Sequence, residues 1–188
     1  MKNIFKTLVF TLVLIISFNA SAQNKEVSTS KSSLQWVGHK LTGKHEGNIN
    51  LESGNLEFDN SKLVGGSFVI NMESITCTDM NGEYGDKLVG HLKNDDFFST
   101  DKFKTASFEI TEVREIKNNS YEVTGNLIIK GISRPNTFTM NVTPTSAMAN
   151  IKVDRTKYGI KYKSKSFFDN LGDKFIYDEF DVIVNLKF

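Results

Sequence analysis

Apolar residues at every second position recur along most of this chain, and this pattern limits the folds that it can adopt. A period of two places alternate side chains on opposite faces of a β-strand. The sequence therefore predicts about eight strands, each with one buried face. The expected strands carry the apolar sets Leu34, Trp36 and Gly38; Leu56 and Phe58; Phe68, Ile70 and Met72; Ala106, Phe108 and Ile110; Tyr121, Val123, Gly125, Leu127 and Ile129; Phe138, Met140 and Val142; Ala147, Ala149, Ile151 and Val153; and Phe180, Val182, Val184, Leu186 and Phe188.

The connections between these segments are mostly short and polar, which favours antiparallel neighbours. No long helical segment alternates with the strands, so a parallel α/β sheet is excluded. Eight or so antiparallel strands form either a closed barrel or a two-sheet sandwich, and the pattern alone does not separate the two. Residues 86–98 have the spacing of a short helix, and residues 166–171 form a second short, aromatic, turn-rich segment. We expect one all-β domain over residues 33–188.

The first 22 residues have the three parts of a secretory signal. Lys2 and Lys6 form a basic start, residues 8–18 are an apolar run too short to span a bilayer, and Ala20-Ser21-Ala22 supplies small residues for cleavage. The alternative is a buried N-terminal strand or helix. We predict a periplasmic or secreted protein, cleaved near Ala22-Gln23, in which residues 23–32 form a polar, mobile leader.

The composition of the chain excludes several classes of function and of site. Lys and Arg number 23 against 22 Asp and Glu, and without a basic block nothing indicates nucleic-acid binding. A single cysteine, Cys77, excludes an internal disulfide framework and a multi-cysteine zinc site. In an oxidising compartment Cys77 could form an intermolecular disulfide or act as a reactive thiol, but we favour a half-buried apolar role.

Few residues suggest catalytic chemistry. His39, His45 and His91 could together bind a metal ion, although no carboxylate–histidine spacing supports such a site. No G-x-S-x-G elbow and no phosphate-binding glycine loop is present. We therefore expect no catalytic residue, no metal site and no cofactor. The odd-numbered Lys157, Lys161, Lys163 and Lys165 would share one face of an extended strand, as a solvated face or as a cationic rim for an anionic headgroup.

Several motifs in one order give the chain a family resemblance. The most specific is residues 87–98 (KLVGHLKNDDFF), followed by residues 125–135 (GNLIIKGISRP). Weaker matches are residues 33–36, 43–54, 65–72 with Ser74-Ile75 and Asp79, 153–160 and 181–188. With these motifs behind a signal sequence, the chain resembles the YceI-like family of exported bacterial proteins, also called polyisoprenoid- or lipid-binding proteins.

The resemblance implies a single eight-stranded, antiparallel, lipocalin-like barrel with one or two short helices. It also implies non-covalent binding of an isoprenoid or other long-chain lipid in the apolar interior, for transport, storage or sequestration, without catalysis. Phe97 and Phe98 are candidate gate residues or anchors, and His91, Arg155 and Lys157 are candidate headgroup contacts. The predicted lining, gate residues included, is Trp36, Phe58, Phe68, Ile70, Phe97, Phe98, Phe108, Ile110, Leu127, Ile129, Phe138, Met140, Phe180 and Val182.

Two other functions stay open at this point. The barrel could be a scaffold for a stress-response or surface-interaction protein, which predicts an exposed apolar patch. The chain could also be an enzyme on a lipid-like substrate, with His91, Asp95 or Asp154 as acid or base inside the cavity. Transient membrane contact fits a lipid carrier, and a homodimer through exposed strand edges requires that the barrel is not fully closed.

Overall fold

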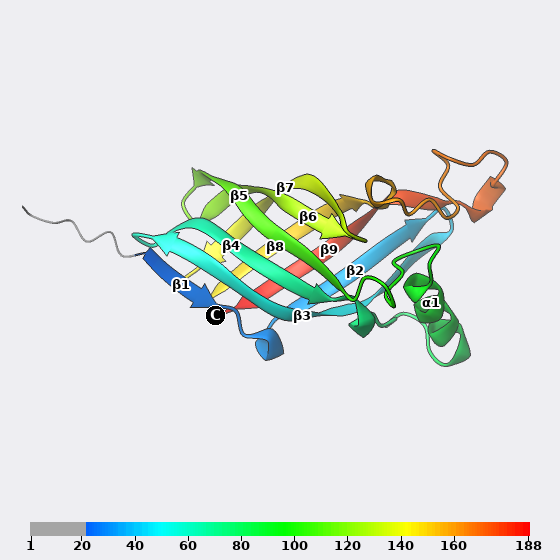
Figure 1. The fold of residues 1–188 in the computed structure, drawn as a ribbon, viewed down its shortest axis with the longest axis horizontal. Coiled ribbons are helices and arrows are strands. Elements are labelled where there is room, and N and C mark those ends of the chain that lie inside the picture. The colour runs from blue at the N-terminus through cyan, green and yellow to red at the C-terminus, as the bar shows by residue number, and fades with distance from the viewer. Residues whose placement is uncertain (1–21) are drawn as a thin grey trace, which may run out of the picture.

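The computed structural model describes residues 22–188, which form one antiparallel β-barrel (Figure 1). This confirms the predicted barrel and decides against the sandwich. The described chain holds one α-helix, α1 (Glu83–Lys93), and four 3₁₀ turns, η1 (Thr29–Lys31), η2 (Met72–Ser74), η3 (Arg155–Tyr158) and η4 (Gly172–Lys174). The strands are β1 (Ala22–Glu26), β2 (Ser33–Lys40), β3 (Gly43–Asp59), β4 (Lys62–Asn71), β5 (Thr105–Lys117), β6 (Ser120–Ile129), β7 (Ile132–Thr143), β8 (Ser146–Asp154) and β9 (Ile176–Lys187).

The long strand β3 closes the barrel. The strand order is β1-β3-β2-β9-β8-β7-β6-β5-β4, and β3 also pairs with β4. The first part of β3 pairs with β2, whereas its second part pairs with β4 on one edge and with β1 on the other. Among the described residues, β1 pairs with β3 alone, and β7 pairs with β8 only from Met140 to Thr143, so some strand edges stay unpaired.

The start of β3 has no strand beside it on the β4 side, and the segment after β4 covers this edge instead. Thr76 N donates to Asn48 O (2.9 Å), and Thr78 N donates to Glu46 O (2.9 Å). Gly47 permits this approach, because a Cβ atom there would lie 1.8 Å from Thr76 O. The wall of the barrel is thus completed by residues that form no strand.

The two ends of the barrel differ. One end, the terminal end, carries β1, the C-terminus and the turns at residues 60–61, 118–119 and 144–145 (Figure 1). The other, the α1 end, carries α1, the turns at 41–42 and 130–131, and the long β8–β9 connection. None of the described helices is both long and apolar enough to span a membrane.

The polar segment at residues 23–32 is not the mobile leader that its composition suggested. β1 pairs with β3 in the register Gln23↔Phe58, and Val27, the apolar residue after β1, is buried. The prediction missed this strand because its backbone, rather than an apolar face, makes the pairing. The predicted signal peptide, residues 1–21 with Ala22, lies outside the described residues except for Ala22 at the start of β1.

Two shorter predictions are also refined. The helix expected within residues 86–98 begins and ends earlier, as α1, and residues 94–98 form a turn. The lysines from 157 to 165 do not share a strand face, because η3 and a series of turns replace the expected strand. Gly159, in the left-handed region at φ 76°, ends η3 and turns the chain away from β8.

Candidate functional site: an apolar cavity at the α1 end

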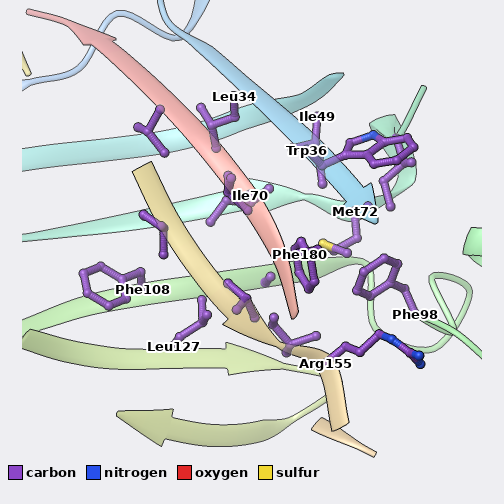
Figure 2. Close-up of a pocket in the computed structure, with 18 of the residues that line it drawn as sticks. Leu34, Trp36, Ile49, Ile70, Met72, Phe98, Phe108, Leu127, Arg155 and Phe180 are labelled. Atoms are coloured by element: carbon purple, nitrogen blue, oxygen red, sulfur yellow. The ribbon is translucent and has the colours of Figure 1, made fainter. Parts of the chain in front are cut away.

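An apolar cavity of about 180 Å³ lies inside the barrel and extends to the α1 end (Figure 2). Side chains from each of the strands β2 to β9 line it, and Trp36, Met72, Phe98, Phe180 and Arg155 gather at its outer part. Its lining is Leu34, Trp36, Gly38, Ile49, Leu51, Phe68, Ile70, Met72, Ile75, Leu92, Phe97, Phe98, Ala106, Phe108, Leu127, Ile129, Phe138, Ile151, Val153, Arg155, Ile176, Tyr177, Phe180, Val182, Val184 and Leu186.

Glycines on neighbouring strands leave room for two of the large rings. A Cβ atom on Gly125 would lie 2.4 Å from the ring of Phe108, and one on Gly54 would lie 2.5 Å from the ring of Phe68. Each ring therefore takes the place that a neighbouring side chain would occupy on the barrel wall. This arrangement keeps aromatic side chains in the lining without filling the centre of the barrel.

The cavity brings together all but three of the predicted lining residues. Trp36, Phe68, Ile70, Phe97, Phe98, Phe108, Leu127, Ile129, Phe138, Phe180 and Val182 line it. Phe58, Ile110 and Met140 do not: they belong to the packed core of the terminal end, where the Phe58 and Phe188 rings lie 6.0 Å apart. Strand alternation identifies which face points inward, but it does not show where along the barrel the interior is filled.

The prediction also missed part of the lining. Alternation placed Leu34, Gly38, Val184 and Leu186 on the same faces as the predicted residues of their strands, but the predicted lining did not include them. Met72, Ile75 and Leu92 come from η2, from the segment after it and from α1. The strand pattern placed Met72 on the face of Phe68 and Ile70, although it lies in η2. It carries no signal for Ile75 and Leu92, which lie outside the strands.

Phe97 and Phe98 follow α1 and are both buried at the cavity. Their rings lie 5.1 Å apart, and Phe98 meets Phe180 edge-on at 6.2 Å. Lys130 Nζ, on the β6–β7 turn, donates to Phe97 O (2.7 Å) and Asp95 O (3.1 Å), so this segment is tied to the barrel rim. The position is compatible with both predicted roles, as an anchor and as a gate.

Arg155 is the charged member of the lining, and three of its five N–H donors are engaged by backbone carbonyls. Its side chain is buried, and Nε, Nη1 and Nη2 donate to the carbonyl oxygens of Tyr177 (3.1 Å), Ile160 (3.0 Å) and Ile176 (3.1 Å). Burial lowers the pKa of Arg155, whereas Asp178, 3.5 Å from Nη2, raises it. The guanidinium therefore binds the β8–β9 connection to the start of β9.

The other predicted headgroup residues lie outside the cavity. Lys157 is exposed on η3, and His91 lies on α1 in contact with the rings of Phe97 and Tyr162, at centroid distances of 5.6 and 4.3 Å. The candidate acids and bases His91, Asp95 and Asp154 are likewise absent from the lining. Asp95 accepts from Lys102 Nζ (2.7 Å), which places it in a surface ion pair.

The three histidines face different carboxylates. His39 lies 2.7 Å from Asp181, His45 lies 2.8 Å from Asp79, and His91 lies 3.7 Å from Asp96. Within residues 22–188, no three His, Cys, Asp or Glu side chains are close enough together to hold a metal ion. The geometry thus brings no support for a three-histidine site.

Asp79 anchors the segment that covers the start of β3. Its carboxylate accepts from Glu46 N (2.9 Å), His45 Nδ1 (2.8 Å) and the Cys77 thiol (3.2 Å). Burial raises the pKa of Asp79, but these hydrogen bonds outweigh it and hold the pKa at about 2. Burial, together with the hydrogen bond to Asp79, raises the pKa of half-buried Cys77, which keeps it a thiol.

We expect Asp79→Asn to lower the free energy of unfolding by about 1 kcal/mol at neutral pH, since the carboxylate is partly solvated. The pKa of Asp79 is lower in the folded protein than the ordinary value of 3.8, so its stabilisation is complete above that value and is lost as the pH falls toward 2. The free energies of unfolding of the wild type and of Asp79→Asn, measured with urea, should therefore converge in acid. An equal gap at every pH would contradict this account, and Asp101→Asn, on an exposed turn, is the matched control.

A family model of the YceI-like domain matches residues 26–188. The chain belongs to the YceI-like family. Among relatives, a UPF0312 protein of Shewanella denitrificans is 30% identical over 126 residues, which cover 66% of this chain and 64% of that protein. A UPF0312 protein of Vibrio cholerae is 28% identical over 138 residues, covering 72% and 71%. The match thus spans somewhat under two thirds of the Shewanella protein.

Solved structures share the fold of this YceI-like chain. Burkholderia cenocepacia BcnA superposes with a TM-score of 0.67 at 20% identity, covering 85% of this chain and 98% of that one. A polyisoprenoid binding domain from Saccharophagus degradans, implicated in plant cell wall breakdown, has a TM-score of 0.57 at 15% identity, covering 89% and 97%. The Campylobacter jejuni YCEI protein has a TM-score of 0.52 at 16% identity, covering 100% and 96%.

Proposed function

We propose that this protein is a binding protein, not an enzyme, that holds an isoprenoid or another long-chain lipid non-covalently in its barrel. The apolar cavity at the α1 end carries the proposal: its one charged lining residue, Arg155, has three of its donors engaged by backbone carbonyls. A structural neighbour from Saccharophagus degradans, named as a polyisoprenoid binding domain, supports the ligand class. No cofactor is required for this function.

The size of the cavity sets how the ligand lies. A cavity of about 150 Å³ accepts benzene, so one of 180 Å³ takes the apolar end of a chain rather than a whole polyisoprenoid. The remainder leaves past Phe97 and Phe98, which turn aside as a gate. Each buried CH₂ contributes about 0.8 kcal/mol, whereas a headgroup hydrogen bond contributes about 1 kcal/mol, so the chain dominates affinity.

The composition of the N-terminal segment supports a proposal for the compartment in which the protein acts. We propose that the chain is exported, cleaved near Ala22-Gln23 and active in the periplasm or outside the cell. An aqueous compartment between membranes requires a carrier for lipids, and transport with transient membrane contact is the role that we favour over storage. Cleavage at this point would remove only Ala22 from β1 and leave the pairs from Gln23 to Glu26 with β3.

The test is native mass spectrometry of protein purified from a bacterial periplasm, followed by organic extraction. We expect one prenyl or long-acyl compound per chain, and a protein mass equal to that of a chain whose first residue is Gln23. The single tryptophan, Trp36, lines the cavity, so its fluorescence reports uptake of geraniol, farnesol and geranylgeraniol by the emptied protein.

Affinity should rise about tenfold or more with each added isoprene unit until the chain outgrows the cavity. The length at which affinity stops rising then measures how much chain the barrel holds. A protein that is empty as purified and takes up none of the three alcohols would refute the proposal, and the family membership would then describe the fold alone.

A further inference from the structure

The β8–β9 connection, residues 155–175, exposes two adjacent aromatic side chains. Phe167 and Phe168 are 47% and 50% exposed. Backbone N–H groups of both residues donate to Ser164 O (3.2 and 3.0 Å), and Ser164 is fully buried. A turn held in this way keeps the two rings in solvent instead of letting them fold back onto the barrel. Burying them would be favourable, so the turn is suited to an apolar surface outside the chain.

The connection that carries the two rings is rich in lysine. The same connection carries five lysines and the buried Arg155, against the acids Asp169 and Asp173. Lys161 Nζ lies 4.5 Å from the Phe167 ring centroid. None of these lysines has a carboxylate within 4.0 Å in residues 22–188, whereas Lys62 and Lys152, on the barrel wall, do. The five are Lys157, Lys161, Lys163, Lys165 and Lys174.

This connection projects beyond the strands at the α1 end, where the cavity lies (Figure 1). Its first residue, Arg155, lines the cavity, and so do Ile176 and Tyr177 directly after it. Leu41, which is 50% exposed, follows Lys40, and Lys40 pairs with Ile176, so the β2–β3 turn lies at the same rim. Exposed apolar side chains and unpaired lysines therefore gather where the cavity reaches the end of the barrel.

We propose that the β8–β9 connection docks the α1 end of the barrel onto an anionic lipid bilayer. The interface of such a bilayer offers phosphates for the lysines and an acyl boundary for Phe167 and Phe168. A nucleic acid offers no apolar layer for these rings. Docking in this orientation lets a chain pass between cavity and bilayer without crossing water. This last step rests on the proposed function; the docking itself rests on the loop.

The experiment measures co-sedimentation of the mature chain with vesicles. We expect binding to vesicles of phosphatidylglycerol and phosphatidylcholine in equal parts, weakened by salt, and little binding to phosphatidylcholine alone. Each lysine near the surface is worth about fivefold, so Lys161→Glu with Lys165→Glu should weaken binding at least about 25-fold. Phe167→Ser with Phe168→Ser should weaken it by at least about tenfold.

The matched control is Val64→Ser with Ile116→Ser, since these residues are 51% and 48% exposed at the terminal end. These changes should leave vesicle binding unaltered. A second measurement places a tryptophan probe in the loop. In the double variant Phe168→Trp with Trp36→Phe, the tryptophan emission should shift to shorter wavelength when anionic vesicles are added. In the double variant Ile116→Trp with Trp36→Phe, it should not shift. The proposal would be overturned if the protein did not bind anionic vesicles, or if salt did not weaken the binding. It would also be overturned if the control variants weakened vesicle binding as much as the loop variants do.

Uptake of farnesol without vesicles separates the two proposals. Loop variants that keep uptake but lose vesicle binding support the docking surface. Wild-type protein that takes up farnesol but binds no anionic vesicle refutes docking alone, while protein that binds vesicles but no isoprenoid refutes the proposed cargo alone.

Discussion

Ala106→Phe is expected to weaken isoprenoid binding about a hundredfold while leaving the barrel folded. Ala106 is a small, buried residue on β5 that lines the cavity opposite Ile70 of β4. A phenyl ring fits a cavity of 180 Å³, because about 150 Å³ accepts benzene. The ring would take the place of about four CH₂ groups of the ligand, and their loss costs about 3 kcal/mol of binding free energy.

Titration of Trp36 fluorescence with farnesol would measure this loss. The added ring fills existing space, so the free energy of unfolding should change by less than about 2 kcal/mol. Thr105→Phe is the matched control: Thr105 is the exposed neighbour on the same strand, so its ring lies outside the barrel and should leave affinity unchanged. Undiminished affinity in a folded Ala106→Phe protein would mean that the ligand lies elsewhere on the molecule.

Alternation predicted an antiparallel β domain, and the family resemblance added that the sheet closes into a barrel. Because a closed sheet has one inside, strand parity then identified most of the lining. The residues Phe68, Phe108 and Phe138 were predicted on this basis, and all three line the cavity. Strand parity does not show where along the barrel axis an inward-facing residue lies. Phe58 and Met140 point inward as predicted, but they pack at the terminal end and leave no space there.

Features made by the backbone or by loops were beyond prediction. β1 is held by hydrogen bonds to β3 that polar residues make as well as apolar ones. The covering segment at Thr76 depends on the missing side chain of Gly47, and sequence alone does not show which atom approaches a glycine. The lysines from 157 to 165 were assigned to a strand because odd spacing resembles one, although turns carry Lys161 to Phe167, Lys163 to Tyr162 and Lys165 to Phe175 instead.

Arg155→Met is expected to lower the free energy of unfolding of the empty protein by about 3 kcal/mol. The sequence suggested a headgroup contact, but the guanidinium donates to three carbonyl oxygens of the β8–β9 connection and the start of β9. Methionine would fill a similar volume and leave buried acceptors without a donor. At about 2–4 °C per kcal/mol for a chain of this size, the unfolding temperature should fall by about 6–12 °C.

The two roles of Arg155 separate in measurements without ligand. Arg155→Lys keeps the charge but cannot reach three carbonyls at once, so a structural role predicts an intermediate loss of stability. Arg114→Met controls for removing an arginine, because Arg114 is exposed and its pair with Glu122 is worth at most about 1 kcal/mol. If the empty Arg155→Met protein melted like the wild type and bound only charged lipids more weakly, Arg155 would be the headgroup contact first predicted. The expected result is the reverse, with a lower melting temperature in the absence of any lipid, since the carbonyls lose their donor whether or not the cavity is filled.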